Sequence, residues 1–580
     1  MAYNPADMKQ WSWQTTLWLM VAFVLLFWWL ALDSLVMDSP TMDEQNHIAR
    51  GLAFLRTGDP RLSLEHPPLV NAISALPLLT MSNIRLPLDH PSWERQPPDV
   101  YWYVFADLLL WDYNHDVGRI LFLARLPVVV LTLGLALAVF RWAWALWGRQ
   151  AGLLAFALVL FDPNVLAHGR YVTTDLGGTL FLFLATWALW RLWQKPTWGR
   201  WLVTAVTLGC AFGSKLSMLG FVPIFALMAF LPGEGQWSWR EAGRRLGLYL
   251  TAGAAATAVV WAIFGFEWGT LQMPGETFTF LNGLSAPMPT FWAGIAKILT
   301  LTSGGRQAYL LGQFSTEGFA AYFPVAFAAK TPLAVLLVLP LAAGWLLWQR
   351  PFRTKTLFLL TPPVLYFAVT LASDLNLGYR HLLPMLPFLY IVLVGVVGDS
   401  AESIIAKTQR ITFTNGSALT LILDHLPLTI FLFLLAAQLL VALSIHPHYL
   451  SYFNRAVGGP ENGYHILLDS NIDWGQDLLR LQQWMRENGV TEVKLGWFGT
   501  AEPAYYAIPH EPLPGFPEAE FLSQWTNPPF NTAAPEPGVY AISVSNLMEL
   551  PLPESGVYAW FRQRKPDARI GYSIMIYDLR

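Results

Sequence analysis

Long apolar runs alternate with short polar breaks over the first 445 residues of the chain. Because a helix needs about 20 mostly apolar residues to cross a bilayer, this pattern predicts about 11 membrane-spanning helices. They are expected at 15–37, 119–141, 150–168, 176–193, 200–214, 216–231, 246–266, 325–348, 357–373, 381–398 and 425–445. The first run has no small-residue cleavage site, so we expect it to be retained as a signal anchor.

Basic residues in the short loops predict the orientation, since Lys and Arg concentrate on the cytoplasmic side of a membrane. With the N-terminus inside, five basic loops fall on that side. They hold Arg141 and Arg149; Arg191, Lys195 and Arg200; Arg240, Arg244 and Arg245; Arg350, Arg353 and Lys355; and Lys407 and Arg410. Three longer segments, 38–118, 267–324 and 446–580, are then expected to face outward.

The outward segments differ in character. The first contains two amphipathic stretches, 46–55 and 69–79, that are expected to lie along the membrane surface as helices. The second, 267–324, is rich in Gly, Pro and Thr and is expected to fold back against the helix bundle.

In the tail the long apolar runs stop. A helix is predicted at 474–487, with Asp473 as its N-cap and Gly489 as its stop. Strands are predicted at 492–498, 539–544 and 570–577. The predicted fold is therefore a mainly α, polytopic membrane domain (1–445) followed by a small soluble α/β domain (446–580).

Composition supports the membrane class. The chain is 54% hydrophobic and 13% charged, whereas soluble proteins carry about 25% charged residues. The net charge of −3 argues against a nucleic-acid partner. The single cysteine, Cys210, has no partner for an internal disulfide.

Ionisable residues gather at the predicted outer ends of the spans, where they are functional candidates by default. They are Asp43, Glu44, His66, Arg170, Asp175, Lys215, Lys330 and Arg380. Acids and bases at one membrane–water boundary suit sugar transfer from a lipid phosphate to a hydroxyl. A carboxylate would remove the hydroxyl proton, and cations would stabilise the departing phosphate. Direct displacement would invert the anomeric centre, and the reaction demands no metal.

Several motifs resemble a known superfamily. Asp43-Glu44 after the first span, Glu65-His66-Pro67-Pro68-Leu69 and Arg170-Tyr171…Asp175 are similar to dolichyl-phosphate-mannose protein mannosyltransferases and bacterial aminoarabinose transferases. The stretches 327–333, 378–384 and 458–477 resemble bacterial members. The resemblance implies the GT-C fold and a polyprenyl- or dolichyl-phosphate sugar donor. It also implies transfer on the periplasmic or lumenal face, here of a bacterial inner membrane.

The resemblance also implies roles for individual residues. Asp43 would be the general base, while Glu44 and Asp175 would shape the acceptor and sugar pocket. The residues implied in binding the substrate and its lipid phosphate are Lys330, Tyr379, Arg380, Arg170, Lys215 and His66. His66 stands where the mannosyltransferases carry His and the aminoarabinose enzymes carry Lys. No additional β-trefoil domain is evident, so a protein, a lipid or a glycan remains open as the source of the acceptor hydroxyl.

Simpler structural interpretations exist for each site residue. Asp43 and Glu44 could be solvated loop acids, Asp175 an N-cap, Lys330 a snorkelling lysine, and Arg380 a partner of Asp374. Lys215 could be a turn lysine, and His66 could cap the helix after the prolines.

Two other functions fit the sequence less well. A flippase for lipid-linked sugars is disfavoured because the acids lie outside the bundle rather than at its midplane. A receptor would use the tail as a binding module.

The sequence also contains patterns that resemble metal sites. Segment 469–477 resembles a calcium loop, but Trp474 and Arg480 stand where an EF-hand requires Gly and Glu. We therefore expect a turn leading into a helix. The histidines His47, His66, His90 and His115 are not at paired zinc-ligand spacing.

Overall fold

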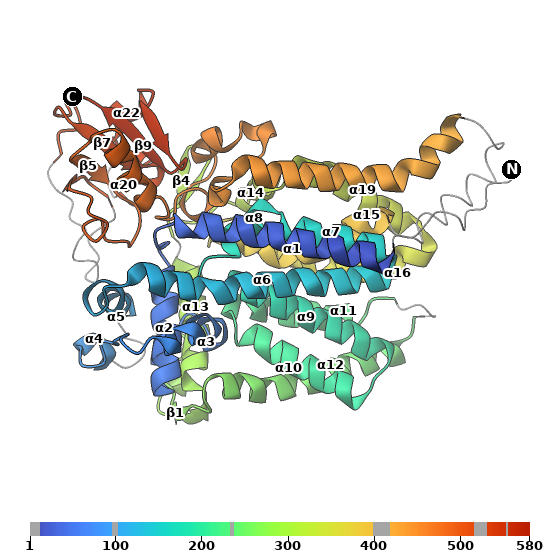
Figure 1. The fold of residues 1–580 in the computed structure, drawn as a ribbon. Coiled ribbons are helices and arrows are strands. Elements are labelled where there is room, and N and C mark those ends of the chain that lie inside the picture. Colours follow the sequence, from blue (N-terminus) through green and yellow to red (C-terminus); the bar gives the residue numbers. More distant parts are fainter. Residues whose placement is uncertain are drawn as a thin grey trace.

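A bundle of long helices and a small domain at one end of it make up the protein (Figure 1). The computed structural model describes residues 12–94, 102–232, 237–304, 306–397, 418–515, 530–552 and 555–580. The bundle helices run roughly along one direction, and the C-terminal domain lies at the end away from the N-terminus. The predicted class, mainly α with a small C-terminal α/β region, is confirmed.

Each predicted span falls on one or more observed helices of the bundle. These are α1 (Trp13–Val36), α6 (Val117–Trp147), α7 (Arg149–Leu160), α8 (Pro163–His168), α9 (Asp175–Gln194), α10 (Trp198–Phe212), η5 (Leu216–Gly220), α11 (Phe221–Met228), α12 (Trp239–Ile263), α14 (Tyr322–Lys330), α15 (Leu333–Trp348), α16 (Arg350–Thr370), η7 (Tyr379–Met385), α17 (Leu386–Leu393), η8 (Val394–Val397) and α19 (Ala418–Ile445).

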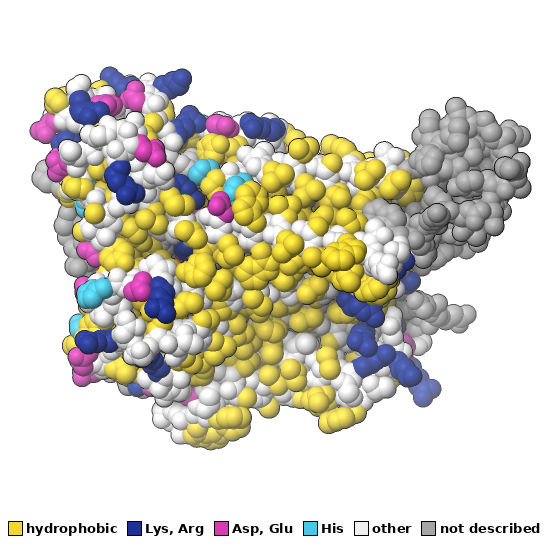
Figure 2. All heavy atoms as spheres, viewed as in Figure 1, with side chains coloured by type: hydrophobic (Ala, Val, Ile, Leu, Met, Phe, Trp, Pro, Cys, Tyr) yellow, Lys and Arg dark blue, Asp and Glu magenta, His cyan; other side chains and the backbone are white. Residues whose placement is uncertain are grey.

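The protein is a multi-pass membrane protein. Among the described residues, six helices are long and apolar enough to cross a membrane, or seven if one bent pair counts as a span. The predicted count of about 11 is not confirmed, because helices such as α7, with 12 residues, are too short to qualify. Figure 2 shows a broad apolar belt along the bundle, with Lys and Arg at its end opposite the C-terminal domain. The predicted basic loop holding Lys407 and Arg410 lies outside the described residues.

Two spans predicted as continuous helices are broken in the structure. Segment 150–168 divides because the Asp162 carboxylate caps α8, accepting from the backbone N–H groups of Asn164 and Val165 at 2.8 and 3.0 Å. Segment 325–348 bends by 110° between α14 and α15, just before Pro332, which has no N–H to donate. Backbone carbonyl oxygens without a helical partner at this bend accept hydrogen bonds from side-chain amides that are distant in sequence. The Asn454 amide nitrogen, for example, lies 3.0 Å from the Thr331 carbonyl oxygen.

The first outward segment contains more helix than the sequence predicts. It comprises α2 (Glu44–Thr57), η2 (Arg61–Ser63), α3 (Pro68–Ala75), η3 (Leu76–Thr80), α4 (Pro91–Glu94), α5 (Trp102–Asp107) and η4 (Leu108–Asp112). The two predicted helices are present as α2 and α3–η3. In α2, residues 44–53 are all buried within the protein. Its charged side chains are therefore held inside the protein, where each needs a partner.

The second outward segment, which was expected to fold back against the bundle, consists of short strands and one longer helix. It comprises β1 (Trp268–Thr270), η6 (Thr279–Leu281), β2 (Ser285–Pro287), α13 (Pro289–Gly304), β3 (Ala308–Leu310) and β4 (Gln313–Ser315). Helix α13, which the sequence reasoning missed, packs closely on the first outward segment. A Cβ at Gly294 would lie only 2.2 Å from the carbonyl oxygen of Leu64.

The tail forms a five-stranded sheet in the order β6-β5-β7-β9-β8. Its elements are η9 (Tyr449–Ser451), η10 (Arg455–Val457), η11 (Pro460–His465), η12 (Asp469–Asn471), α20 (Leu478–Glu487), β5 (Val493–Gly496), β6 (His510–Pro512), β7 (Val539–Ser543), α21 (Val544–Leu547), α22 (Ala559–Arg562), β8 (Ala568–Ile570) and β9 (Ile574–Asp578). Strand β5 is parallel to β6 and β7, and β9 is antiparallel to β7 and β8.

The predicted strands at 492–498 and 539–544 correspond to β5 and β7. The predicted strand at 570–577 is divided into β8 and β9 by a turn in which Tyr572 has a φ of 67°. Strand β6 was not predicted.

The predicted N-cap of the tail helix is wrong. Helix α20 begins after Asp477, while the buried Asp473 carboxylate accepts a hydrogen bond from the backbone N–H of Ser545 at 3.0 Å. Burial raises the pKa of Asp473 to about 8. At neutral pH the folded protein therefore keeps this carboxyl protonated, whereas an unfolded chain ionises it.

We expect Asp473→Asn to stabilise the protein at alkaline pH. The raised pKa makes the neutral carboxyl most stabilising below about pH 4, and this contribution is lost as the pH rises towards 8. An amide avoids the loss, so the stability of the variant relative to the wild type should rise by about 1.4 kcal/mol per pH unit between pH 5 and pH 8. Thermal unfolding followed by tryptophan fluorescence at both pH values measures this gain. The exposed variant Glu492→Gln is the control, and equal effects of both substitutions would contradict the assignment.

Candidate functional site

A cavity of about 530 Å³ lies at the end of the bundle that carries the C-terminal domain (Figure 1), between α2, α9, η5, α13, α16 and η7. Charged and polar side chains form one part of its wall: Asp43, Asn46, His47, Arg50, Glu65, His66, Tyr103, Thr174, Asp175, Lys215, Ser217, Arg306, Thr370, Ser373, Arg380 and His381. Apolar side chains form another: Leu216, Leu219, Ile295, Ile298, Leu299, Phe323, Val369, Leu375 and Leu377. A cavity with both kinds of wall suits a ligand with a charged head and an apolar chain.

Five of the predicted site residues line this cavity together: Asp43, His66, Asp175, Lys215 and Arg380. Asp43 Oδ2 lies 2.8 Å from Arg380 Nη1, and Asp175 forms an ion pair with Lys215. Arg380 thus pairs with Asp43 rather than with Asp374, and Asp43 is no free loop acid. The cavity walls hold their acids and bases as matched pairs.

Asp43 remains accessible despite its ion pair. Its side chain is 28% exposed at the cavity wall. Burial acts to raise the pKa of Asp43, but the neighbouring Arg380 guanidinium outweighs this effect and holds it below its ordinary value. Asp43 is therefore a carboxylate at neutral pH. Arg380 Nε, in turn, is buried and has no hydrogen-bond partner among the residues that the structure describes.

Two histidines contact each other in the cavity. The rings of His47 and His66 are 4.7 Å apart and steeply inclined, and His47 Nδ1 lies 2.9 Å from Asn71 Oδ1. Burial, reinforced by nearby Arg50, lowers the pKa of His47 to about 4 and that of His66 well below its ordinary value. Both rings are therefore neutral at pH 7. Strongly shifted pKa values in a cleft are typical of functional sites.

His47 and Arg50 are site residues that the sequence reasoning missed. They follow Asp43 by one and two helical turns on α2, so they face the same cavity. This spacing was visible in the sequence, because residues four and seven apart lie on one face of a helix. His381, next to Arg380, was also missed, and its Nε2 atom is buried without a hydrogen-bond partner in the described part of the chain.

Four predicted site residues do not line the cavity. Glu44 is fully buried and pairs with Arg125 through two contacts of 2.6 and 2.9 Å. It also accepts from the backbone N–H groups of Thr41 and Val172, each at 2.9 Å. This carboxylate therefore joins α6 and the loop before α9 to the first outward segment.

The other three residues are also held by the protein itself. Lys330 Nζ donates to the carbonyl oxygen of Leu450 at 2.9 Å, and the Tyr379 hydroxyl lies 3.1 Å from Thr331 Oγ1. Arg170 forms an ion pair with Asp38. All three side chains are buried, and none of them lines the cavity.

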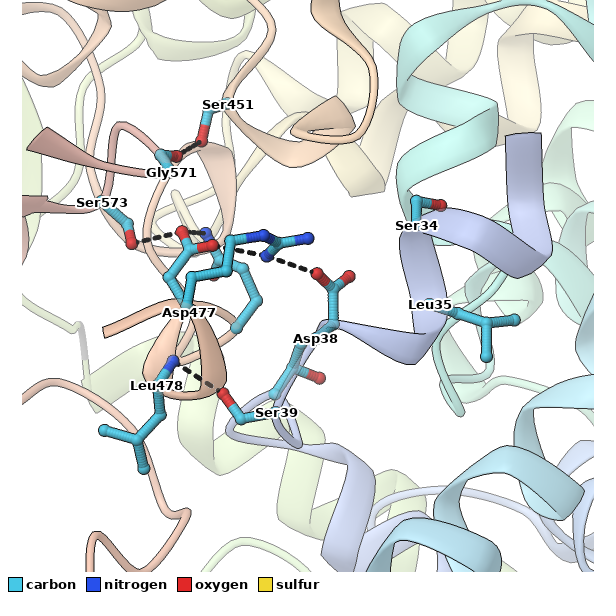
Figure 3. Close-up of polar contacts among 12 residues, drawn as sticks. Ser34, Leu35, Asp38, Ser39, Ser451, Asp477, Leu478, Gly571 and Ser573 are labelled. Carbon is cyan, nitrogen blue, oxygen red and sulfur yellow. Dashed lines mark hydrogen bonds and ion pairs between the residues drawn. The ribbon is translucent and has the colours of Figure 1, made fainter. Parts of the chain in front are cut away.

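Asp38 is the centre of a buried network that the sequence reasoning did not single out. Its carboxylate accepts from Arg170, from the Tyr171 hydroxyl at 2.7 Å and from Arg480 at 2.7 Å. Burial acts to raise the pKa of Asp38, but the surrounding guanidinium groups lower it to about 2. Figure 3 shows Asp38 and Ser39 facing Asp477 and Leu478 of the tail, so this network joins the tail to the bundle.

The acids in the predicted turn 469–477 have separate partners. Asp477 accepts from Ser573 at 2.6 Å and from Arg480 at 2.6 Å, while Asp473 accepts from Ser545. Among the described residues, no three His, Cys, Asp or Glu side chains form a group that could hold a metal ion.

Comparison with known proteins extends these observations. The sequence family described as dolichyl-phosphate-mannose-protein mannosyltransferase matches residues 109–263. The resemblance predicted from the motifs is thereby confirmed over this region. No curated protein matches the chain in sequence.

Several solved structures are similar to the chain at low sequence identity. ArnT from Cupriavidus metallidurans in the apo state has 13% identity and a TM-score of 0.48, with 97% of this chain and 98% of that chain covered. The same protein bound to undecaprenyl phosphate has 12% identity, a TM-score of 0.44 and coverages of 96% and 97%. The archaeal oligosaccharyltransferase AglB from Archaeoglobus fulgidus, in complex with an inhibitory peptide and a dolichol-phosphate, has 13% identity and a TM-score of 0.43, with coverages of 90% and 62%.

The two members of the acidic pair should respond differently to substitution. Glu44→Gln leaves buried Arg125 without its counter-charge, and such a loss costs about 3–5 kcal/mol of stability. Asp43→Asn removes a partly exposed carboxylate and should cost about 1 kcal/mol or less. Thermal unfolding of the purified variants in detergent measures both effects. Equal loss of stability in the two variants would contradict this division of roles.

Proposed function

Starting from the family match over residues 109–263, we propose that the protein is a membrane glycosyltransferase. In this proposal it moves a sugar from a polyprenyl-phosphate carrier, undecaprenyl- or dolichyl-phosphate, to a hydroxyl group with inversion at the anomeric carbon. The observation that carries the proposal is the Asp43–Arg380 pair in a cavity lined by both charged and apolar side chains. It places a carboxylate base beside a cation.

The donor fits the two kinds of wall. The phosphate would bind at Arg380 and Lys215, and the first carbons of its lipid would lie against the apolar side chains of α13 and α16. Arg380 and Lys215 both line the cavity, and their cationic groups can donate charge-assisted hydrogen bonds to phosphate oxygens. The known ligands of similar structures, undecaprenyl phosphate and dolichol-phosphate, have this same combination of charge and lipid.

The transfer step follows from these positions. Asp43 accepts the proton of the acceptor hydroxyl, whose oxygen forms a bond to the anomeric carbon on the face opposite the phosphate. The bond between that carbon and the phosphate oxygen breaks, and its electron pair remains on the phosphate. Arg380 and Lys215 stabilise the charge that develops there, which is the largest electrostatic demand of the reaction.

The site would face the periplasm of a bacterial inner membrane. It lies at the same end of the bundle as the tail, where Lys and Arg are mixed with Asp and Glu, whereas at the other end of the apolar belt Lys and Arg occur with few acids (Figure 2). Such an excess of positive charge is typical of the cytoplasmic side. The acceptor hydroxyl, on a protein, a lipid or a glycan, would then approach from the outer face.

Replacing the proposed base tests the function directly. We expect Asp43→Asn to lower kcat by about 10²–10⁴-fold, the usual contribution of a positioned base. The donor KM should change far less, because Arg380 remains in place. The assay supplies a polyprenyl-phosphate sugar and an acceptor in detergent and measures the new glycosidic bond by mass spectrometry.

The exposed outer-face acid Asp374 provides the matched control, and Asp374→Asn should leave transfer unchanged. Undiminished transfer by Asp43→Asn would remove the assignment of the base. A wild-type protein that forms no glycosidic bond but moves the lipid-linked sugar across vesicles would instead be a flippase.

We also expect transfer to be independent of metal ions. Arg380 and Lys215 supply the positive charge that a metal would otherwise provide at the departing phosphate. Turnover should therefore persist in EDTA after extensive dialysis. A loss of turnover that a divalent cation restores would contradict this expectation.

A further inference from the structure

A tail segment inserts between the outer ends of the bundle helices next to the cavity. It is residues 469–477, the stretch that resembles a calcium loop, and none of the chemistry described above uses it. Residues 470–477 are almost entirely buried. Gly475 has a φ of 86°, and a Cβ there would lie 3.0 Å from Gly499 and 3.5 Å from the carbonyl of Pro40. The segment is therefore enclosed between the first outward segment and the tail sheet.

Trp474 brings this segment into contact with the proposed phosphate-binding arginine. The Arg380 guanidinium carbon lies 4.4 Å from the centre of the Trp474 ring, at cation–π distance. The indole is only 1% exposed and is fixed by edge contacts with His168 at 5.9 Å and Tyr171 at 6.3 Å. Arg380 thus has one nitrogen on Asp43 and one face on Trp474, while its Nε lacks a partner in the described part of the chain.

Asn471 holds in place the backbone of the turn that contains Arg380. Its side-chain oxygen accepts from the Tyr379 N–H at 2.9 Å, and its amide donates to the Tyr322 hydroxyl at 2.9 Å. At Gly378, φ is 133° and a Cβ would lie 2.4 Å from Ser470 Oγ. The turn 378–380 and the tail segment therefore leave each other no room to move.

We propose that Trp474 is a positioning residue for the donor phosphate and that the tail segment 469–477 is part of the active site. This inference rests on the proposed function, because it assigns Arg380 to the lipid phosphate. The indole face would hold the guanidinium plane so that Nη1 stays on Asp43 and the edge of the group that borders the cavity meets the phosphate. The planar group has a fixed donor pattern, so a rotated guanidinium would meet the phosphate poorly.

The experiment compares Trp474→Leu and Trp474→Phe in the full-length protein. Removing the aromatic face should raise the donor KM and the Kd for undecaprenyl phosphate about 5- to 30-fold, the range of a desolvated cation–π contact. The Phe variant should recover most of this loss, and kcat should change much less than KM. A purely structural role would not distinguish Phe from Leu in this way.

Trp497 provides a matched control for damage to the tail. It is equally buried, and its indole N–H donates to the carbonyl of Ala501 at 3.2 Å, within the tail. Trp497→Leu should lower the unfolding temperature but leave the donor KM unchanged. Asn471→Ala is the second test, because it releases Tyr379 without altering the indole, and it should raise the donor KM in the same way.

The outcomes separate this inference from the proposed function. If wild-type protein neither binds undecaprenyl phosphate nor transfers sugar, the proposed function fails. If wild-type protein does both, and Arg380→Met weakens donor binding, but Trp474→Leu, Trp474→Phe and Asn471→Ala all retain the wild-type KM, only the inference fails. If Trp474→Leu fails to fold, Trp474→Phe and Asn471→Ala decide the question. An unchanged donor KM in both of these variants overturns the proposal.

Discussion

The buried carboxylate of Asp38 is the interaction on which the rest of the outer end depends. It binds Arg170 before α9 and Arg480 in the tail, and its backbone carbonyl accepts from Arg125 of α6 at 2.9 Å. A charge removed from water must be matched by partners in fixed positions, because an unpaired buried charge is strongly destabilising. Replacing such a network by apolar side chains is often neutral for stability. Its consequence here is therefore one of geometry: three segments distant in sequence meet in a single arrangement around the cavity.

The same constraint explains how two adjacent acids come to occupy different environments. Helix α2 begins at Glu44, so successive side chains point in different directions around the helix axis. Glu44 points into the bundle and forms an ion pair with Arg125, whereas Asp43, at the N-cap position, borders the cavity. The burial of Glu44 holds the start of α2 in place, and this start determines where Asp43 lies. The structural acid thus positions the proposed catalytic one.

The spacing of the apolar residues and the short polar breaks between apolar runs predicted most of the helices, because both signals are local. The helix breaks at Pro163 and Pro332 also had local signals in the sequence. The side chains that bond the backbone groups freed at such a break, such as Asn454 beside Thr331, lie far away in sequence. The least predictable feature was which acid pairs with which cation. Any outer-end cation could neutralise any outer-end acid, and only packing decides that Arg380 meets Asp43 while Arg170 meets Asp38. His47 and Arg50 were predictable in principle, since they follow Asp43 at helical spacing on α2.

In the proposed function, the ion pair at the cavity would link binding of the donor to the strength of the base. Arg380 lowers the pKa of Asp43, which makes this carboxylate a weaker proton acceptor. A phosphate that binds the same guanidinium shares its positive charge and adds a negative charge nearby, and both effects raise the pKa of Asp43. Asp43 would then become a better base only when a donor is present. If Trp474 holds the guanidinium between the two anions, it maintains the geometry that this linkage requires, and the tail contributes to the chemistry as well as to the fold.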